Sequence, residues 1–133
     1  MTIYKLQRTG KPMLRFEGEL LFDTNEGWKN DSTRWHNLRL YRTKAGGYVL
    51  CIIYCSRYRG ESAGHHLAEV CETPAEVIKH LYAYRVEDHI QGYPEGPQFH
   101  DRQRRLIADV RRQFDDQLTE LLMSDETFTE RVE

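Results

Sequence analysis

Strand patterns occupy the first half of this chain and helix patterns the second, and this order constrains the fold more than any other feature. Up to Glu72, short segments either alternate apolar and polar residues or carry an unbroken apolar run. After Thr73, apolar residues recur with helical spacing. Strands followed by helices indicate an α+β domain. We therefore predict an antiparallel sheet of four to five strands over residues 2–72, followed by two helices over 74–89 and 98–123 packed on one face.

The predicted strands differ in how many of their faces are apolar. Residues 13–23 alternate, which indicates one wet face, and the apolar side holds Leu14, Phe16, Leu20 and Phe22. Residues 48–55 read YVLCIIYC and are apolar on both sides, as is typical of a central strand that is covered on both faces. A turn at residues 44–47 with two glycines predicts a hairpin between residues 35–43 and 48–58.

Both predicted helices have clear signals. Thr73, Pro74 and Glu76 form a capping box with proline at the first helical position. The second helix has one apolar arc, made of Leu106, Ile107, Val110, Phe114, Leu118 and Leu121. At about 39 Å it is longer than a small sheet, so we expect its far end, residues 118–123, to pack on a second copy of the chain. Residues 124–133 are predicted to be a polar tail on a single domain of residues 1–123.

Length and charge narrow the class of protein. The chain has 133 residues, the size of one domain, and a formal net charge of −2, so the molecule as a whole is not expected to attract nucleic acid or acidic membranes. No segment approaches the roughly 20 apolar residues of a membrane helix, and the N-terminus lacks a secretory pattern. Three cysteines without metal-site spacing predict free thiols. We expect a cytoplasmic protein with no membrane partner.

One segment departs from the nearly even charge of the whole chain, because residues 34–60 hold six Arg or Lys residues and no Asp or Glu. If Leu38 and Leu40 face the core, strand alternation places Trp35, Arg39 and Tyr41 on the other side. The neighbouring strand adds tyrosines, and the long loop before the hairpin adds a tryptophan. The predicted partner-binding residues are Trp28, Trp35, Arg39, Tyr41, Tyr54 and Tyr58.

Three interpretations of this basic, aromatic face follow. Tyr, Trp and Arg are enriched at protein interfaces, so the first is a non-enzymatic binding or accessory domain for a protein partner or a second copy. The alternative is a single-stranded nucleic-acid platform, in which aromatic rings stack on bases. In the third, the side chains of this face have their partners within the same chain: either Glu17 and Glu19 form ion pairs with Arg39, or a helix covers the face.

The sequence has few signs of catalytic or metal-binding chemistry. No residue has the setting of a catalytic nucleophile, no histidine spacing matches a metal motif, and we predict no cofactor. The remaining enzyme hypothesis is a hydrolase-like site in the segment that carries Glu61, His65 and His66.

The arginines of the second helix favour a solvated surface over a recognition helix. Each of three arginines lies four residues from an aspartate, which makes them neighbours on a helix. The predicted pairs are Arg105–Asp109, Arg111–Asp115 and Arg112–Asp116.

Overall fold

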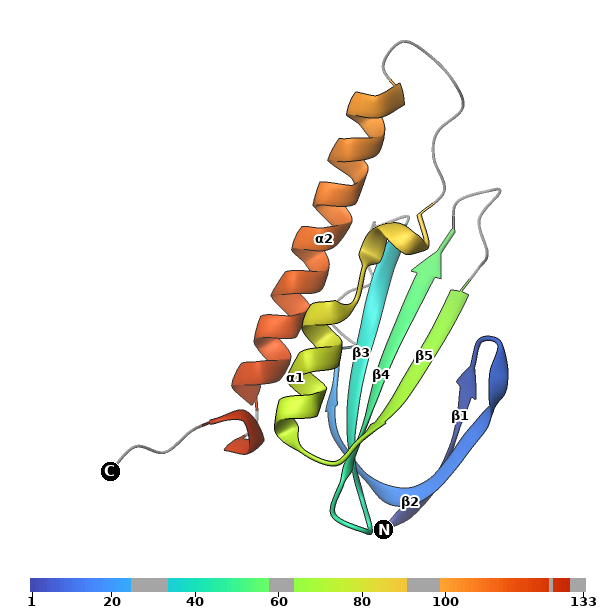
Figure 1. The fold of residues 1–133 in the computed structure, drawn as a ribbon, viewed down its shortest axis with the longest axis vertical. Helices are drawn as coiled ribbons and strands as arrows, with labels where there is room; N and C mark the ends of the chain where they lie inside the picture. Colours follow the sequence, from blue (N-terminus) through green and yellow to red (C-terminus); the bar gives the residue numbers. More distant parts are fainter. Residues whose placement is uncertain (25–33, 58–63, 91–98, 125, 130–133) are drawn as a thin grey trace.

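A computed structural model describes residues 1–24, 34–57, 64–90, 99–124 and 126–129 of the chain, with residues 99 and 100 described by their backbone alone. Its strands are β1 (Thr2–Arg8), β2 (Lys11–Asp23), β3 (Arg34–Thr43), β4 (Tyr48–Ser56) and β5 (Gly64–Cys71). They are followed by α1 (Pro74–Ala83), the short 3-10 helix η1 (Val86–Asp88), α2 (Phe99–Ser124) and a second 3-10 turn, η2 (Glu126–Phe128). Each strand pairs antiparallel with the next one, so the strand order equals the sequence order. The predicted α+β fold is confirmed (Figure 1).

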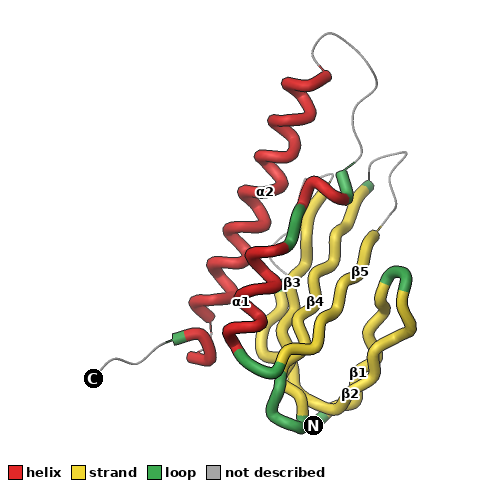
Figure 2. Tube along the Cα trace, viewed as in Figure 1, coloured by secondary structure: helices red, strands yellow, loops and turns green. Residues whose placement is uncertain are grey.

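Both helices cover the same face of the sheet, and the β1–β2 hairpin curls away toward the opposite face (Figures 1 and 2). Leu38 pairs with Ile52, and because opposite residues of an antiparallel pair share a face, both point toward the helices. We call the other face, onto which the hairpin folds, the concave side. The prediction that β4 is covered on both faces is confirmed, since Tyr48–Tyr54 are all buried.

The main core lies between the sheet and the helices. Its fully buried members come from all of these elements and include Leu38, Leu40, Leu50, Ile52, Val77, Leu81, Phe114 and Leu121. Burying a large apolar side chain contributes about 1.5–3 kcal/mol, so this layer is the chief stabilising contact of the domain.

The start of α1 follows the predicted capping box. The Thr73 hydroxyl accepts a hydrogen bond from the Glu76 N–H at 3.2 Å, and the Glu76 carboxylate accepts one from the Glu72 N–H at 2.8 Å. The predicted helix end at residue 89 is wrong, because α1 stops at Ala83 and Tyr84 is extended. The extended backbone lets Tyr84 bury its ring against Phe114, with the ring centroids 5.0 Å apart.

The expectation that residues 118–123 pack on a second copy of the chain is corrected for Leu118 and Leu121, while Met123 is exposed. Leu118 and Leu121 are buried against the sheet, whereas the first turns of α2 extend beyond it (Figure 1). The buried positions of α2 begin at Val110, and Leu106 and Ile107 before it are only half-buried. The C-terminal end of α2 therefore has its packing partner within the same chain. Phe128, in the segment after it, also packs against this core.

A second, smaller core lies on the concave side, where the β1–β2 hairpin folds over β3, β4 and β5. Its buried members are Leu6, Tyr41, Val49, Cys51 and Ala68, and Tyr4, Leu14 and Phe16 pack against them. The strict alternation predicted for residues 13–23 is interrupted by a register shift between Leu20 and Phe22. This shift turns Phe22 to the helix side, while Phe16 stays on the concave side.

Gly18 permits the close approach of β2 to β3. A Cβ at this position would collide with the main-chain oxygen of Arg42, and backbone cannot move aside as a flexible side chain can. We expect Gly18→Ala to lower the free energy of unfolding by about 1–3 kcal/mol, the usual cost of overpacking. Urea denaturation measures this, with the exposed neighbour variant Glu19→Ala as control, expected within about 0.5 kcal/mol of the parent. Equal stability of the two variants would contradict this close approach.

Candidate binding surfaces

The six predicted partner-binding residues do not form one surface. Tyr54 is 2% exposed beneath the helices, and Tyr41 is 3% exposed in the second core on the other side of the sheet. The register that pairs Leu38 with Ile52 also pairs His36 with Tyr54, which turns Tyr54 away from Arg39 and Tyr41. The expectation that these faces coincide is therefore wrong. Trp28 and Tyr58 lie outside the described residues.

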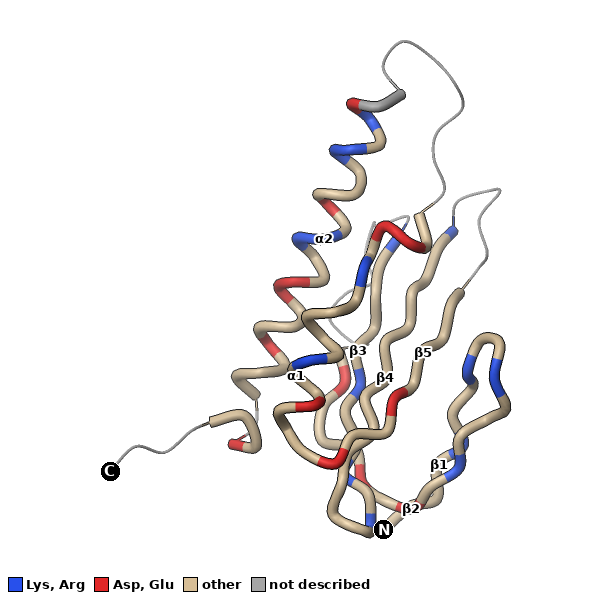
Figure 3. Tube along the Cα trace, in the orientation of Figure 1, with Lys and Arg blue, Asp and Glu red and all other residues tan. Residues whose placement is uncertain are grey.

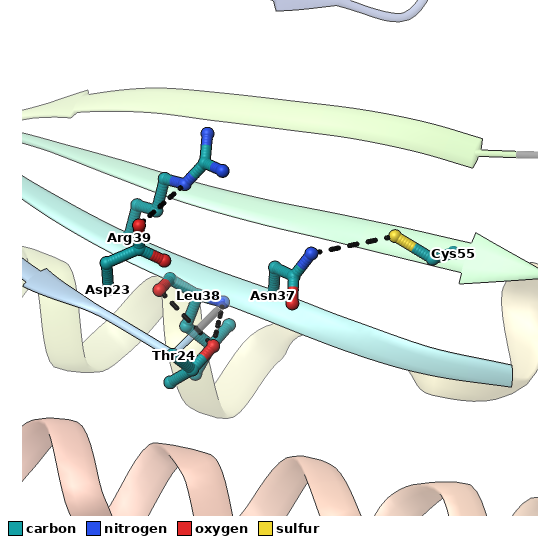
Figure 4. A network of polar contacts seen from close by, with 6 residues as sticks. All are labelled: Asp23, Thr24, Asn37, Leu38, Arg39 and Cys55. Atoms are coloured by element: carbon teal, nitrogen blue, oxygen red, sulfur yellow. Dashed lines mark hydrogen bonds and ion pairs between the residues drawn. The ribbon is translucent and has the colours of Figure 1, made fainter. Parts of the chain in front are cut away.

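Arg39 lies on the concave side in a small polar network (Figure 4). Its Nε is 3.4 Å from an Asp23 carboxylate oxygen, and both side chains are about one third exposed. Nearby, the Asn37 amide donates to the Cys55 sulfur at 3.8 Å. The predicted partners of Arg39, Glu17 and Glu19, are wrong. Glu17 instead pairs with Lys44 at 3.4 Å.

Trp35 is half-buried at the same face, and one side of its ring already has a partner. The Arg57 guanidinium carbon lies 4.9 Å from the Trp35 ring centroid, a cation–π contact. A nucleic-acid base would have to displace this guanidinium to stack there. The described part of the hairpin therefore lacks the series of open aromatic rings that a single-strand platform uses.

A second stretch with basic but no acidic side chains lies on the β1–β2 hairpin. We call residues 2–16 the basic arm, and its cations are Lys5, Arg8, Lys11 and Arg15 (Figure 3). Lys5 lies opposite Arg15 and Arg8 opposite Lys11 in the strand register. Like charges directly opposite each other destabilise a strand pair. Among the described residues, no acidic side chain forms an ion pair with any of these four.

The two faces of the basic arm differ in character. Tyr4 and Phe16 turn inward and contact the Tyr41 ring, with centroids 4.7 and 5.2 Å away. The outer surface carries Lys5 and Arg15 together with Ile3 and Met13, which are 55% and 60% exposed. The basic arm can be recognised in the sequence, because residues 1–16 contain four Lys or Arg and no Asp or Glu. The sequence alone does not single out this stretch, however, because the basic run at residues 34–60 is longer and holds six cations.

The two histidines of the hydrolase-like hypothesis do not share a face of the sheet. His65 and His66 are neighbours in β5, paired with Tyr54 and Ile53, so their side chains point to opposite faces. Glu61 lies outside the described residues. Within the parts of the chain that the structure describes, no group of three or more His, Cys, Asp or Glu side chains could hold a metal ion.

His65 instead joins a ring cluster under the helices. Its ring lies 4.1 Å from that of His89, and His36 shares a hydrogen bond of 2.9 Å with the Tyr84 hydroxyl. Burial, followed by the charge on His89 and then Arg111, lowers the pKa of His36 to about 3. Burial likewise raises the pKa of Tyr84. Both groups are thus neutral at physiological pH, which suits a packed core.

The α2 arginines are partly paired along the helix. The predicted Arg111–Asp115 pair is present at 3.1 Å, but Arg112 pairs with Asp109 at 3.3 Å instead of Asp116. The predicted Arg105–Asp109 pair is not among the ion pairs of the described residues. Arg111 also donates to the Tyr84 carbonyl at 3.0 Å, which ties α2 to the end of α1.

No helix in the described parts of the chain is long and apolar enough to cross a membrane. Comparisons with protein-family models, with curated proteins and with solved structures find nothing that matches this chain.

Proposed function

We propose that this protein is a non-enzymatic binding domain that holds an acidic segment of a partner protein on its basic arm. The observation that carries the proposal is the pairing of Lys5 with Arg15 across two strands, with no ion-pair partner for either among the described residues. Such a pair destabilises the isolated domain, and an acidic ligand would remove the repulsion. The surface that binds the partner would then be the one that lowers the stability of the free protein.

The side chains around these cations favour a protein partner over a nucleic acid. Ile3 and Met13 are exposed beside them, so a ligand with both acidic and aliphatic groups matches the outer surface of the arm. The arm's own aromatic rings, Tyr4 and Phe16, point inward and offer no stacking surface there. Arg39, Trp35 and the buried Tyr41 then belong to the scaffold that supports the arm.

A second copy of the chain falls within the same partner class. The last turns of α2 carry Asp115, Asp116 and Glu120 on its exposed side, and only Asp115 has an ion pair among the described residues. We also propose that the protein acts in the cytoplasm, which its three free cysteines suit, since cytosolic thiols stay reduced.

A matched pair of charge variants tests the function. We expect the parent protein to bind a labelled decaglutamate peptide, and Lys5→Glu/Arg15→Glu to weaken that binding by at least about tenfold, because two attractions become repulsions. Fluorescence anisotropy at two salt concentrations measures the affinity, with a labelled oligothymidylate of equal length in parallel. Light scattering of the same variants reports self-association.

The control is Lys79→Glu/Arg104→Glu, which changes the net charge equally at exposed positions of α1 and α2, away from the basic arm. It should keep the parent affinity for the peptide. Equal weakening by both double variants would reduce the effect to overall charge. Arm-dependent binding of the oligothymidylate without peptide binding would assign the arm to nucleic acid, against the proposal.

A further inference from the structure

A cleft separates the tip of the basic arm from strand β5. Its volume is about 220 Å³, and its walls are Arg8, Thr9 and Lys11 from the arm and residues 65–69 from β5. Two hydrogen bonds hold its sides together: the Thr9 N–H donates to the His66 carbonyl at 2.9 Å, and the His66 N–H donates to the Thr9 hydroxyl at 2.8 Å. The cleft is thus a fixed feature of the fold and not a gap between independent segments.

One wall of this cleft carries a hydrogen-bond donor without an acceptor. The Nε of Arg8 is buried and has no hydrogen-bond partner among the described residues. Buried polar groups are nearly always paired, and a charged one left unpaired is costly. Arg8 also lines the cleft, so an acceptor that enters it would lie beside this guanidinium group.

The charges around the cleft define the kind of acceptor. Arg8 and Lys11 contribute two positive charges and Glu69 one negative charge, so 2 − 1 leaves +1 with the histidines neutral. A single positive charge complements a monoanion better than a dianion such as phosphate near neutral pH. Arginine and lysine are also the side chains that bind carboxylates by charge-assisted hydrogen bonds.

We infer that this cleft is a carboxylate-binding site, and that it receives one acidic side chain of the segment held by the arm. This inference rests on the proposed function for its ligand, but it involves different residues. Lys5 and Arg15 lie outside the cleft walls, whereas Arg8 and Lys11 form them. The cleft would fix the position of a segment that the outer surface attracts only by charge.

Sodium acetate, titrated at constant ionic strength against sodium chloride, probes the cleft directly. In two-dimensional amide NMR spectra we expect saturable shifts at Thr9, His66 and Ala68, with smaller or no shifts for inorganic phosphate. Arg8→Gln should weaken acetate binding at least about tenfold, as expected for the loss of one charge-assisted hydrogen bond. Lys11→Gln should weaken it also, and the exposed control Lys79→Gln should leave it unchanged.

The outcomes separate this inference from the proposed function. Acetate shifts that persist in Lys5→Glu/Arg15→Glu but vanish in Arg8→Gln would support the cleft as a site of its own. Absence of saturable acetate shifts at these amides, or shifts with phosphate alone, would overturn it even where decaglutamate still binds the arm. Unchanged acetate affinity in both Arg8→Gln and Lys11→Gln would overturn it equally.

Discussion

Phe114→Ala is expected to lower the free energy of unfolding by about 3–5 kcal/mol, the largest single effect we predict for this chain. Phe114 is fully buried where α2 meets the sheet. Its ring contacts those of Tyr84 and His36, with centroids 5.0 and 5.2 Å away, and the Arg111 guanidinium lies 5.6 Å from it. Truncation therefore removes apolar burial and leaves a cavity that these rigid rings cannot fill.

Chemical denaturation followed by circular dichroism measures this loss. Tyr82→Ala is the matched control, since it deletes an aromatic ring of α1 that is 61% exposed, and it should change stability by no more than about 0.5 kcal/mol. If Phe114→Ala were no more costly than Tyr82→Ala, α2 would not be packed on the sheet as the structure has it. The deletion should leave the arm cations untouched, so residual folded protein should still bind the acidic peptide.

Mild acid is expected to destabilise the domain through His36. Its pKa falls from 6.5 to about 3 because burial, His89 and then Arg111 disfavour the imidazolium. The folded state therefore binds fewer protons than the unfolded state between these values. The stability that neutral His36 contributes is fully present above pH 6.5 and is lost as the pH falls toward 3. At pH 5 this loss amounts to about 2 kcal/mol.

The partially buried histidines of the same cluster act in the same direction. Burial and then the charge on His66 lower the pKa of His65, and burial and then the charge on His65 lower the pKa of His89 against an opposing effect of Asp88, so both also resist protonation in the fold. Their rings lie 4.1 Å apart, and protonation of both would set two positive charges in contact. The acid transition should therefore begin where η1 meets β5.

Unfolding free energies at pH 7.5, 6 and 5 test this dependence. His36→Gln removes the titrating group while keeping a side chain that can hydrogen-bond the Tyr84 hydroxyl, so its stability should vary less with pH than that of the parent. Lys79→Gln, at an exposed position of α1, is the control and should keep the parental slope. A parental slope in His36→Gln as well would exclude His36 as the source.

Some parts of the candidate site follow directly from local spacing. The alternation about Leu38 and Leu40 correctly places Trp35 and Arg39 on the face opposite the helices. The spacing of Arg111 and Asp115 likewise predicts their ion pair, because residues four apart are neighbours on a helix. Residues three apart are neighbours too, so spacing alone cannot choose between Asp109 and Asp116 for Arg112.

Other parts depend on how separate segments meet. The side of the sheet on which Tyr54 lies depends on the register between β3 and β4, and a slip by one residue would exchange the two faces. The partner of Arg39 depends on the register shift between Leu20 and Phe22, which brings Asp23 opposite it. No pattern within one segment reports either quantity.

The sequence by itself determined the order of strands and helices, the start of α1 and the apolar side of α2, because each rests on a periodicity or cap within a few consecutive residues. Only the tertiary structure decided that the β1–β2 hairpin curls over the concave side and closes a cleft against β5. The reason is physical: the hairpin meets the rest of the sheet through Gly18 beside the Arg42 main chain and Thr9 bonded to His66, contacts between residues far apart in the chain that no pattern within one segment reports.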